Sequence, residues 1–528
     1  MPALVPPTLS ARGRWLTLVA ALLGWMFDGL EMGLFPLVAR PALLDLLGPE
    51  TDRSEISRWV SVITAGFLVG AATGGVLFGW LGDRVGRVRA MTLSVLTYAL
   101  FSGICGLSTD AWQVAVFRFI ASLGMGGEWS LGVALVMEVW PDRSRAWLAA
   151  AIGAAANFGY MIIAVLGLVL SVVITDLHSA MLSVGVGPET SDWLVKNSGW
   201  RILMLCGALP ALLTFLIRLF VPESTRWEAE KQKGSTTHWQ TVDLLGVLVG
   251  AGAACGLIAI WAVADLAIWV RVTGSLVMIL VVTVGYLYPI VRFVRRAEMS
   301  SESTGESPLA AAGLPPDALP AGATGGSPTS LALRAIVGRL LLAAALSGVA
   351  LLGTWGSTQQ APVYADEMTA GQQPTAKAYT QALAAFGAVV GCVAAALVGN
   401  WIGRRITYAL LCVGSIGAIA GLYQLNDAYG PAFLCWAFVA GTITAAFYGW
   451  LPLYLPELFR TKVRATGQGF GFNFGRILAA IGVLQLPVVM KQLQVGWQGA
   501  CTAMSLIYLV GLGLIWLAPE TKGKPLPD

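Results

Sequence analysis

The segment Gly79–Arg87 reads Gly-Trp-Leu-Gly-Asp-Arg-Val-Gly-Arg and forms a short charged turn between two apolar stretches, 59–80 and 90–108. Its second part, residues 82–87, recurs 317 residues later at 399–404 as Gly-Asn-Trp-Ile-Gly-Arg, again between two apolar stretches. A second pair repeats nearby, since Glu138 and Arg145 return as Glu457 and Arg464, both 319 residues later. The chain is therefore predicted to contain two copies of one arrangement of apolar helices.

The composition is typical of a membrane protein. Hydrophobic residues make up 56% of the 528 residues, and charged residues only 12%, about half of the ~25% in soluble domains. A net charge of +4 with scattered cations argues against nucleic-acid binding. His178 and His238 are the only histidines, no Cys-x-x-Cys pair occurs, and no phosphate-binding loop sequence is present. We therefore expect no metal, no cofactor and no enzymatic activity.

Fourteen segments are long and apolar enough to cross a bilayer, which takes ~20 residues of helix. They are 15–40, 59–80, 90–108, 111–140, 147–174, 200–221, 243–264, 268–291, 333–362, 379–400, 404–424, 431–455, 465–490 and 498–518. An even number of spans places both termini on one side. That side carries 22 Lys and Arg in its connections and the other side 6, so the positive-inside rule predicts cytoplasmic termini in a plasma (inner) membrane.

The repeat also predicts the domain organisation. Residues 1–223 form an N-terminal six-helix bundle and 333–528 a C-terminal one. Residues 224–296 hold an inserted helix pair with its flanking loops, expected at the periphery, and the Ser-, Gly- and Pro-rich residues 297–332 are a flexible cytoplasmic linker. A long external loop at 175–199 has no counterpart in the second half. Parallel duplication of this kind places a ligand site between the halves, near the bilayer midplane.

The motifs resemble those of the major facilitator superfamily. Residues 79–87 match its loop signature, Arg118-Phe119 leads to Gly124-Met125-Gly126-Gly127-Glu128, and Pro222-Glu223-Ser224 follows the sixth span. Residues 455–459 and 464–467 add a further block. The resemblance implies an all-α major facilitator fold of fourteen transmembrane helices, and is greatest to the proton-coupled organic-acid branch, in particular sialate:proton symporters. Asn400 departs from the signature, which has Asp there, so we expect weaker gating by the second copy.

Two hypotheses of function remain open on the sequence. The first is a monomeric secondary transporter that works by alternating access and carries a proton together with a small organic anion, sialate-like or another monocarboxylate. The second is a sugar facilitator or sugar:proton symporter, favoured by Pro-Glu-Ser and Pro-Glu-Thr at the ends of the two halves. A membrane enzyme is disfavoured because no nucleophile–base set is evident, and a channel because of the duplicated charge pattern.

Acidic residues within spans are candidates for proton coupling, because a charge at the bilayer centre costs ~3 kcal/mol or more unless it is paired or hydrated. Asp28 and Glu31 share one face of the first span, being three residues apart. Glu128 follows a glycine-rich run in the fourth span. The alternative for each acid is a purely structural pairing with neighbouring groups.

Substrate binding is predicted for polar and aromatic residues in spans. Arg476 is the best candidate for an anion clamp, with Asn473 three residues before it, while Arg118 is either a second clamp or the partner of Asp28 or Glu31. Further candidates, each of which could equally serve packing alone, are Trp355, Gln359, Gln360, Asn157, Tyr160 and Tyr448.

The repeated charges predict a gate at the cytoplasmic side. Asp83 can accept from the N-terminus of a neighbouring helix, and Arg84 and Arg87 can reach acids such as Glu138. The expected gating residues are Gly82, Asp83, Arg84, Gly86, Arg87, Glu138, Arg145, Glu457 and Arg464. A static topology signal is the alternative.

Overall fold

The computed structural model describes residues 10–527 except 141, 211–212, 214–216, 218–219, 233–238, 264–265, 305–327 and 374. The described residues form helices and connections without a strand, and thirteen of their helical segments are long and apolar enough to cross a membrane. The predicted span 200–221 falls in part outside the described residues, as does most of the predicted linker 297–332. The all-helical prediction is confirmed, and the described residues alone do not test the count of fourteen spans.

Particular residues explain where the helices of the N-terminal half begin and where the chain turns between them. Ser10 caps the first helix by accepting from the Gly13 amide at 3.1 Å, and Asp110 caps the fourth by accepting from Trp112 at 2.7 Å. Gly86 has φ +119°, which lets the chain turn sharply between the second and third helices. The helices are α1 (Ala11–Leu47), α2 (Arg53–Val85), α3 (Arg87–Cys105), α4 (Ala111–Val139), α5 (Arg145–Ser183) and α6 (Pro188–Cys206).

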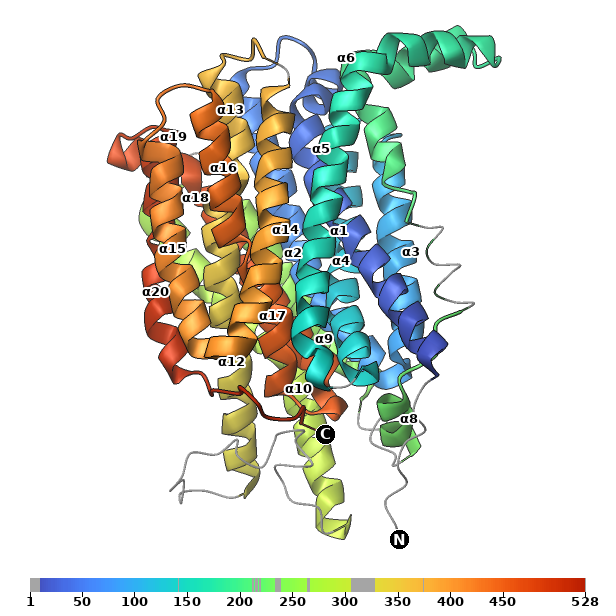
Figure 1. Cartoon of the computed structure of the whole chain (residues 1–528), viewed down its shortest axis with the longest axis vertical. Helices are drawn as coiled ribbons and strands as arrows, with labels where there is room; N and C mark the ends of the chain where they lie inside the picture. The colour runs from blue at the N-terminus through green and yellow to red at the C-terminus, as the bar shows by residue number, and fades with distance from the viewer. Residues whose placement is uncertain are drawn as a thin grey trace.

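The expectation of a loop at 175–199 was wrong, since α5 continues to Ser183 and α6 begins at Pro188. Residues 196–199 interrupt α6 with non-helical backbone angles, and the helical segment around its start extends sideways beyond the bundle (Figure 1). The helix continues past its apolar stretch because polar residues also propagate a helix outside a bilayer.

The remaining helices follow the predicted order. After α8 (Thr225–Gln232), the inserted pair is α9 (Leu244–Ala262) and α10 (Ile268–Thr304). The C-terminal half comprises α12 (Pro328–Gly356), α13 (Ala361–Met368), α14 (Ala376–Ile402), α15 (Arg404–Gln424), α16 (Pro431–Thr444), α17 (Phe447–Tyr454), α18 (Arg464–Leu493), α19 (Trp497–Ser505) and α20 (Ile507–Leu514). Short 3₁₀ turns join several of them, among them η5 (Thr358–Gln360), η6 (Leu455–Leu458) and η7 (Thr461–Val463).

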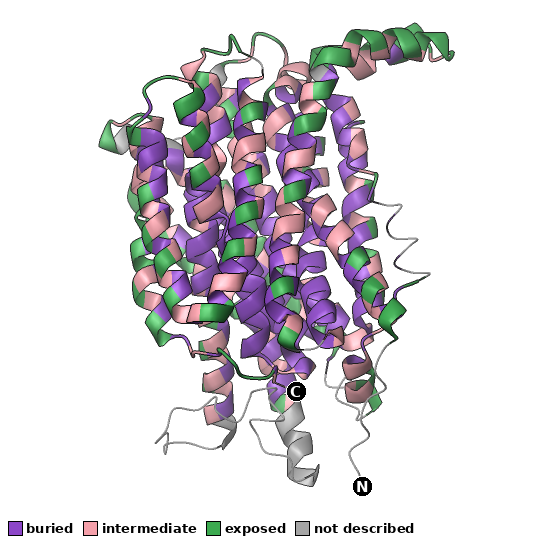
Figure 2. Cartoon of the chain, viewed as in Figure 1, coloured by how far each residue is buried: buried purple, intermediate pink, exposed green. Residues whose placement is uncertain are grey.

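The two halves meet along two seams, one where α2 packs on α18 and one where α5 packs on α14. Glycines make the close approach possible. A Cβ on Gly75 of α2 would lie 2.0 Å from the amide nitrogen of Asn473, and one on Gly153 of α5 would lie 2.7 Å from the Tyr448 carbonyl oxygen. Buried residues concentrate in the centre of the bundle, while exposed and intermediate ones lie on its outside (Figure 2).

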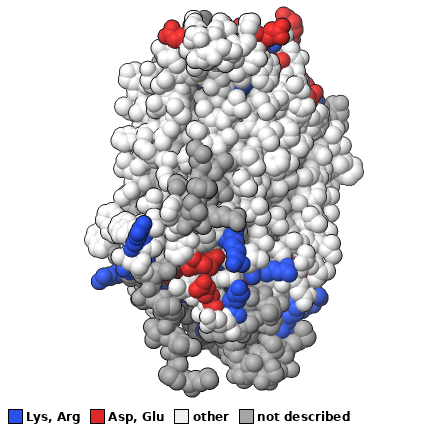
Figure 3. Space-filling model, turned by 90° about the vertical axis from the view of Figure 1, so that its right-hand side faces the viewer, with Lys and Arg blue, Asp and Glu red and all other residues white. Residues whose placement is uncertain are grey.

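The start of α1 and the last residues of the chain lie at the same end of the bundle (Figure 1). The Trp140 indole at the end of α4 donates to the Arg14 carbonyl at 3.2 Å, and Arg145 donates to the Lys524 carbonyl at 2.5 Å. We call this the terminal end and the other the far end. On the face in Figure 3, Lys and Arg gather toward the terminal end, and a broad band without charged residues lies above them. Such a band suits a bilayer.

The inserted pair packs on the outside of the α2–α18 seam. Helix α9 contacts α2 and α18, and α10 contacts α12 and α18. The Tyr286 hydroxyl of α10 lies 2.6 Å from the Thr73 hydroxyl of α2, and both side chains are buried. The pair therefore covers one junction between the halves.

Candidate functional site

Two acids and one arginine lie together at the centre of the bundle. Asp28 of α1 interacts electrostatically with Glu128 of α4 and with Arg476 of α18, and all three side chains are buried. The absence of a side chain at Gly24 makes room for Glu128, since a Cβ there would lie 1.5 Å from its Oε1. Four of their polar atoms lack a hydrogen bond of good geometry, namely Asp28 Oδ1, both oxygens of Glu128 and Arg476 Nη1, and the Glu128 carboxyl lies within reach of Asp28 and Tyr98. Buried polar atoms without well-formed hydrogen bonds at one place are typical of a site that receives water or a ligand.

Glu31 acts electrostatically on Asp28 but is paired with a different arginine. Its Oε1 lies 2.8 Å from Arg118 Nη1, and both side chains are buried. The Arg118 guanidinium lies over the rings of Phe35 and Phe67, 4.9 and 4.7 Å from their centroids. Of the alternatives that the sequence left open, the structure shows the pairing of Arg118 with Glu31.

Aromatic rings border the acid–arginine cluster. Trp129, which follows Glu128 on α4, stacks on Phe472 of α18 with centroids 3.8 Å apart and an angle of 10° between the rings. The Arg476 guanidinium lies 5.2 Å from the Phe472 centroid, and Tyr448 meets the same ring edge-on at 6.5 Å. Arg476 thus borders a stacked aromatic pair built from both halves.

The two predicted asparagines link the halves. Asn473 Nδ2 donates to the Gly126 carbonyl of α4 at 3.1 Å, while its Oδ1 has no partner. Asn157 donates to the Gly153 carbonyl in its own helix and to Cys392 Sγ of α14 at 3.4 Å. Asn473 therefore keeps a buried acceptor available, whereas the Asn157 amide is used in packing.

Toward the far end, other predicted residues form a layer of neutral hydrogen bonds. The Tyr160 hydroxyl of α5 donates to Gln359 Oε1 of η5 at 2.6 Å, and Gln360 donates to the Trp355 carbonyl within its own half. Two fully buried glutamines were not predicted from the sequence: Gln381 of α14, which lies in this layer, and Gln468, which lies near the start of α18. A glutamine inside an apolar span was the signal that could have identified them.

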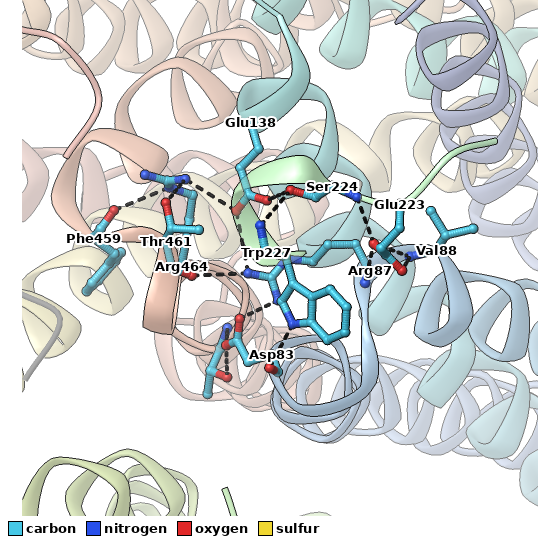
Figure 4. Close-up of polar contacts among 11 residues, drawn as sticks. Asp83, Arg87, Val88, Glu138, Glu223, Ser224, Trp227, Phe459, Thr461 and Arg464 are labelled. Atoms are coloured by element: carbon cyan, nitrogen blue, oxygen red, sulfur yellow. Dashed lines mark hydrogen bonds and ion pairs between the residues drawn. The ribbon is translucent and has the colours of Figure 1, made fainter. Parts of the chain in front are cut away.

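At the terminal end, a charged cluster joins the halves (Figure 4). Glu138 Oε1 lies 3.4 Å from Arg87 and 3.3 Å from Arg464, so one carboxylate is held by an arginine from each half. Asp83 pairs with Arg87 at 2.5 Å. Its other oxygen accepts from the amide of Thr466 at 2.9 Å and from the Thr466 hydroxyl at 2.5 Å, at the start of α18. A carboxylate is well placed at a helix N-terminus.

A second cluster repeats this arrangement with the halves exchanged. Glu457 Oε1 lies 2.7 Å from Arg404 of its own half and 2.9 Å from Arg145 of the other. The Thr521 hydroxyl donates to Glu457 at 2.5 Å, as the Ser224 hydroxyl does to Glu138. The two arginines that cross between the halves also hold the end of the chain, since Arg145 donates to the Lys524 carbonyl and Arg464 to the Pro527 carbonyl, each at 2.5 Å.

Two further acids cap helices beside these clusters. Glu223 accepts from the amides of Arg87 and Val88, and Glu520 from those of Arg404 and Arg405. Burial raises the pKa of Glu223 in spite of these amides. Burial also acts on Glu520, but the amides of Arg404 and Arg405 outweigh it and hold the pKa of Glu520 below its usual value.

The other predicted gating residues have local roles. A Cβ on Gly82 would lie 2.1 Å from Leu131 Cδ2, so a larger residue there would have to displace the Leu131 side chain. Arg84 does not reach Glu138; it donates to the Thr241 hydroxyl at 2.8 Å and lies over the Trp80 ring. Asn400, in the position equivalent to Asp83, is exposed. Hence only Asp83 of these two residues accepts from a helix of the other half.

Comparison with known proteins places this chain in a family of transporters. Residues 17–241 and 363–528 match the family described as sugar (and other) transporter. A putative metabolite transport protein of Haemophilus influenzae is 24% identical over 97% of this chain and 98% of its own. A probable 4-methylmuconolactone transporter of Cupriavidus pinatubonensis is 26% identical over 96% of this chain and 91% of its own.

Among solved structures, the major facilitator superfamily proton:xylose symporter XylE bound to 6-bromo-6-deoxy-D-glucose is similar over 98% of both chains, with a TM-score of 0.64 and 16% sequence identity. At that identity the likeness concerns the fold. It agrees with two bundles that meet along the α2–α18 and α5–α14 seams.

Proposed function

The chain belongs to the sugar (and other) transporter family, and from this premise we propose that it is a secondary active transporter that carries a small organic anion together with a proton. The family and the similar structures are transporters of the major facilitator superfamily, not enzymes. The observation that carries the proposal is the central cluster of Asp28, Glu128 and Arg476, with its polar atoms that lack well-formed hydrogen bonds.

The charges of this cluster supply the coupling. Two neighbouring carboxylates repel each other, and the single guanidinium of Arg476 compensates one negative charge. One proton held by Asp28 or Glu128 therefore makes the empty site neutral. When the carboxylate of a substrate binds Arg476, the second acid loses its counter-charge, and a buried unpaired charge is costly. A second proton restores neutrality, so anion and proton bind together.

The membrane potential favours the same stoichiometry. Moving one negative charge into a negative-inside cell costs ~2.3 kcal/mol per 100 mV. One proton carried with a monoanion removes that cost and adds the pH gradient. Uptake should rise when the outside is acidified and fall when a protonophore is added.

Hydrogen bonds between the halves on both sides of the central cluster support alternating access. The charged clusters close the terminal end, and the Tyr160–Gln359 bond joins the halves toward the far end. We place the termini in the cytoplasm of a plasma (inner) membrane because Lys and Arg concentrate on that side.

The proposed substrates are monocarboxylates, with sialate as one member of the test panel and aromatic acids as others. Aromatic rings border Arg476, with Trp129 stacked on Phe472, and such a lining suits a carboxylate with an unsaturated body. The relative named for 4-methylmuconolactone also supports a small organic compound as substrate.

A sugar remains the second candidate, because the description of the family names sugar transporters and a similar fold belongs to a proton:xylose symporter. Arg476 in the central cluster favours an organic anion over a sugar, because only an anion can use the guanidinium as a counter-charge.

A panel of radiolabelled sialate, lactate, benzoate and hexoses in proteoliposomes, at two external pH values and with a protonophore, separates the two candidates. Organic-acid uptake that acid stimulates would support the proposal. Hexose uptake independent of pH would refute it. Asp28→Asn should abolish proton-driven accumulation while retaining exchange of substrate for substrate.

A further inference from the structure

Gln381 of α14 hydrogen-bonds across the interface between the two halves. Its Nε2 donates to the carbonyl oxygen of Gly33 in α1 at 3.3 Å and to that of Tyr160 in α5 at 3.4 Å. One side chain of the C-terminal half thus binds the backbones of two helices of the N-terminal half. The side chain is fully buried, although amides are costly to bury without good partners.

The local sequence is shaped around this contact. A Cβ on Gly33 would lie 2.9 Å from Gln381 Nε2 and 2.9 Å from a ring carbon of Tyr160. Glycine at this position therefore lets the amide and the tyrosine ring approach α1 together. The Tyr160 side chain adds a second bond between the halves through Gln359.

The contact lies on the far side of the central cluster. Helix α1 starts at the terminal end, and Gly33 is five residues beyond Asp28, about 7.5 Å further along the helix. Helix α14 runs the opposite way, and Gln381 lies near its far-end start. At the far end itself, Arg40 and Asp366 form only a long ion pair of 3.7 Å in which Arg40 is exposed.

The orientation of the amide leaves one atom unused. Both partners of Gln381 are carbonyl oxygens, which only accept, so the nitrogen must face them. Its Oε1 then points elsewhere and has no donor. A donor supplied by water or by a substrate would satisfy this oxygen and hold the amide in its bonding orientation.

We propose that Gln381 is the positioning residue that closes the far end of the transport path, by fastening α14 to the backbones of α1 and α5 beyond the Asp28–Glu128–Arg476 cluster. The inference rests on alternating access and not on the identity of the substrate or the coupling ion. Opening at the far end breaks both bonds of Nε2, whereas the charged clusters at the terminal end are unaffected.

The test measures far-end opening directly, without a substrate. Spin labels on cysteines introduced at Leu44 and Glu367, in a variant whose native cysteines are replaced, report the distance between α1 and α13. These positions leave the Arg40–Asp366 pair intact. Gln381→Leu removes the donor at similar size, and Gln381→Glu keeps a polar side chain if the first variant folds poorly. Thr380→Val is the matched control, because the Thr380 hydroxyl bonds to Ala376 within its own helix.

We expect the ratio of far-end-open to closed molecules to rise about tenfold in Gln381→Leu and Gln381→Glu, and to stay within about twofold in Thr380→Val. Unchanged distances in both Gln381 variants, or an equal shift in Thr380→Val, would overturn the proposal. Failure of the uptake panel would leave this distance measurement unaffected, so the two proposals can fail separately.

Discussion

Replacing Asp83 by asparagine should unlock the terminal end. Only bonds that are lost on opening count toward this effect. The pairing of Asp83 with Arg87 lies within one half and persists, whereas the bonds from the amide and hydroxyl of Thr466 cross between the halves. A hydrogen bond to a charged group contributes about 1.5–3 kcal/mol and one between neutral groups about 0.5–1.5 kcal/mol. Two bonds weakened by about 1 kcal/mol each shift the equilibrium by about 2 kcal/mol, or about 30-fold toward the open state.

The assay is a distance measurement between spin labels at Arg89 and Trp401, both exposed at the terminal end on opposite halves. In Asp83→Asn the longer distance should gain population, and uptake should fall although the protein still inserts. Thr466→Val removes only the hydroxyl donor and should give about half of the free-energy change. Asn400→Ala, at the equivalent exposed position of the other half, is the control. An unchanged distance distribution together with normal uptake in Asp83→Asn would show that the residue is a static topology signal.

Three further perturbations test other contacts. Arg476→Lys should lose most uptake of whichever organic acid the panel identifies, because an ammonium cannot form the bidentate contact of a guanidinium; normal uptake would exclude Arg476 as the anion clamp. Truncation after Gly523 removes the carbonyls of Lys524 and Pro527, to which Arg145 and Arg464 donate. The accessibility of cysteines introduced at the terminal end should then rise severalfold. No rise would show that this segment does not help to close that end. Tyr286→Phe removes the hydrogen bond to Thr73. Thermal unfolding in detergent should show a loss of about 0.6 kcal/mol in the free energy of unfolding, the average for such bonds in membranes, while uptake stays normal. A large transport defect would contradict a supporting role of the inserted pair.

The sequence predicted the helices well because crossing a bilayer demands long apolar segments, which composition alone reveals. It could not predict that α5 continues to Ser183, since helix outside the membrane has no apolar signal. The repeated spacing of seven residues between Glu138 and Arg145 suggested a gate, but it did not show which residue pairs with which. The two residues lie on different helices, since α4 ends at Val139 and α5 begins at Arg145, and each has a partner in the other half.

The candidate site was predictable only in part, for a physical reason. Charged residues within spans are conspicuous, and Asp28, Glu128 and Arg476 do lie together. Which arginine pairs with which acid depends on how α1, α4 and α18 pack, and hydropathy does not contain that information. Gln381 was missed because a neutral amide scarcely changes the apolar character of its helix, although its two bonds depend on a glycine 348 residues away.

The exchanged pairing at the terminal end has a consequence for turnover rate. When the halves separate, Glu138 keeps Arg87 and Glu457 keeps Arg404, so neither carboxylate is ever stripped of a cation on the way to the open state. Arg464 likewise keeps the Phe459 carbonyl and the Thr461 hydroxyl. The activation barrier then contains the loss of individual contacts and not the cost of a buried carboxylate without a cation, which is several kcal/mol. Such an arrangement can hold one end firmly shut and still let it reopen without an external energy source at the gate itself.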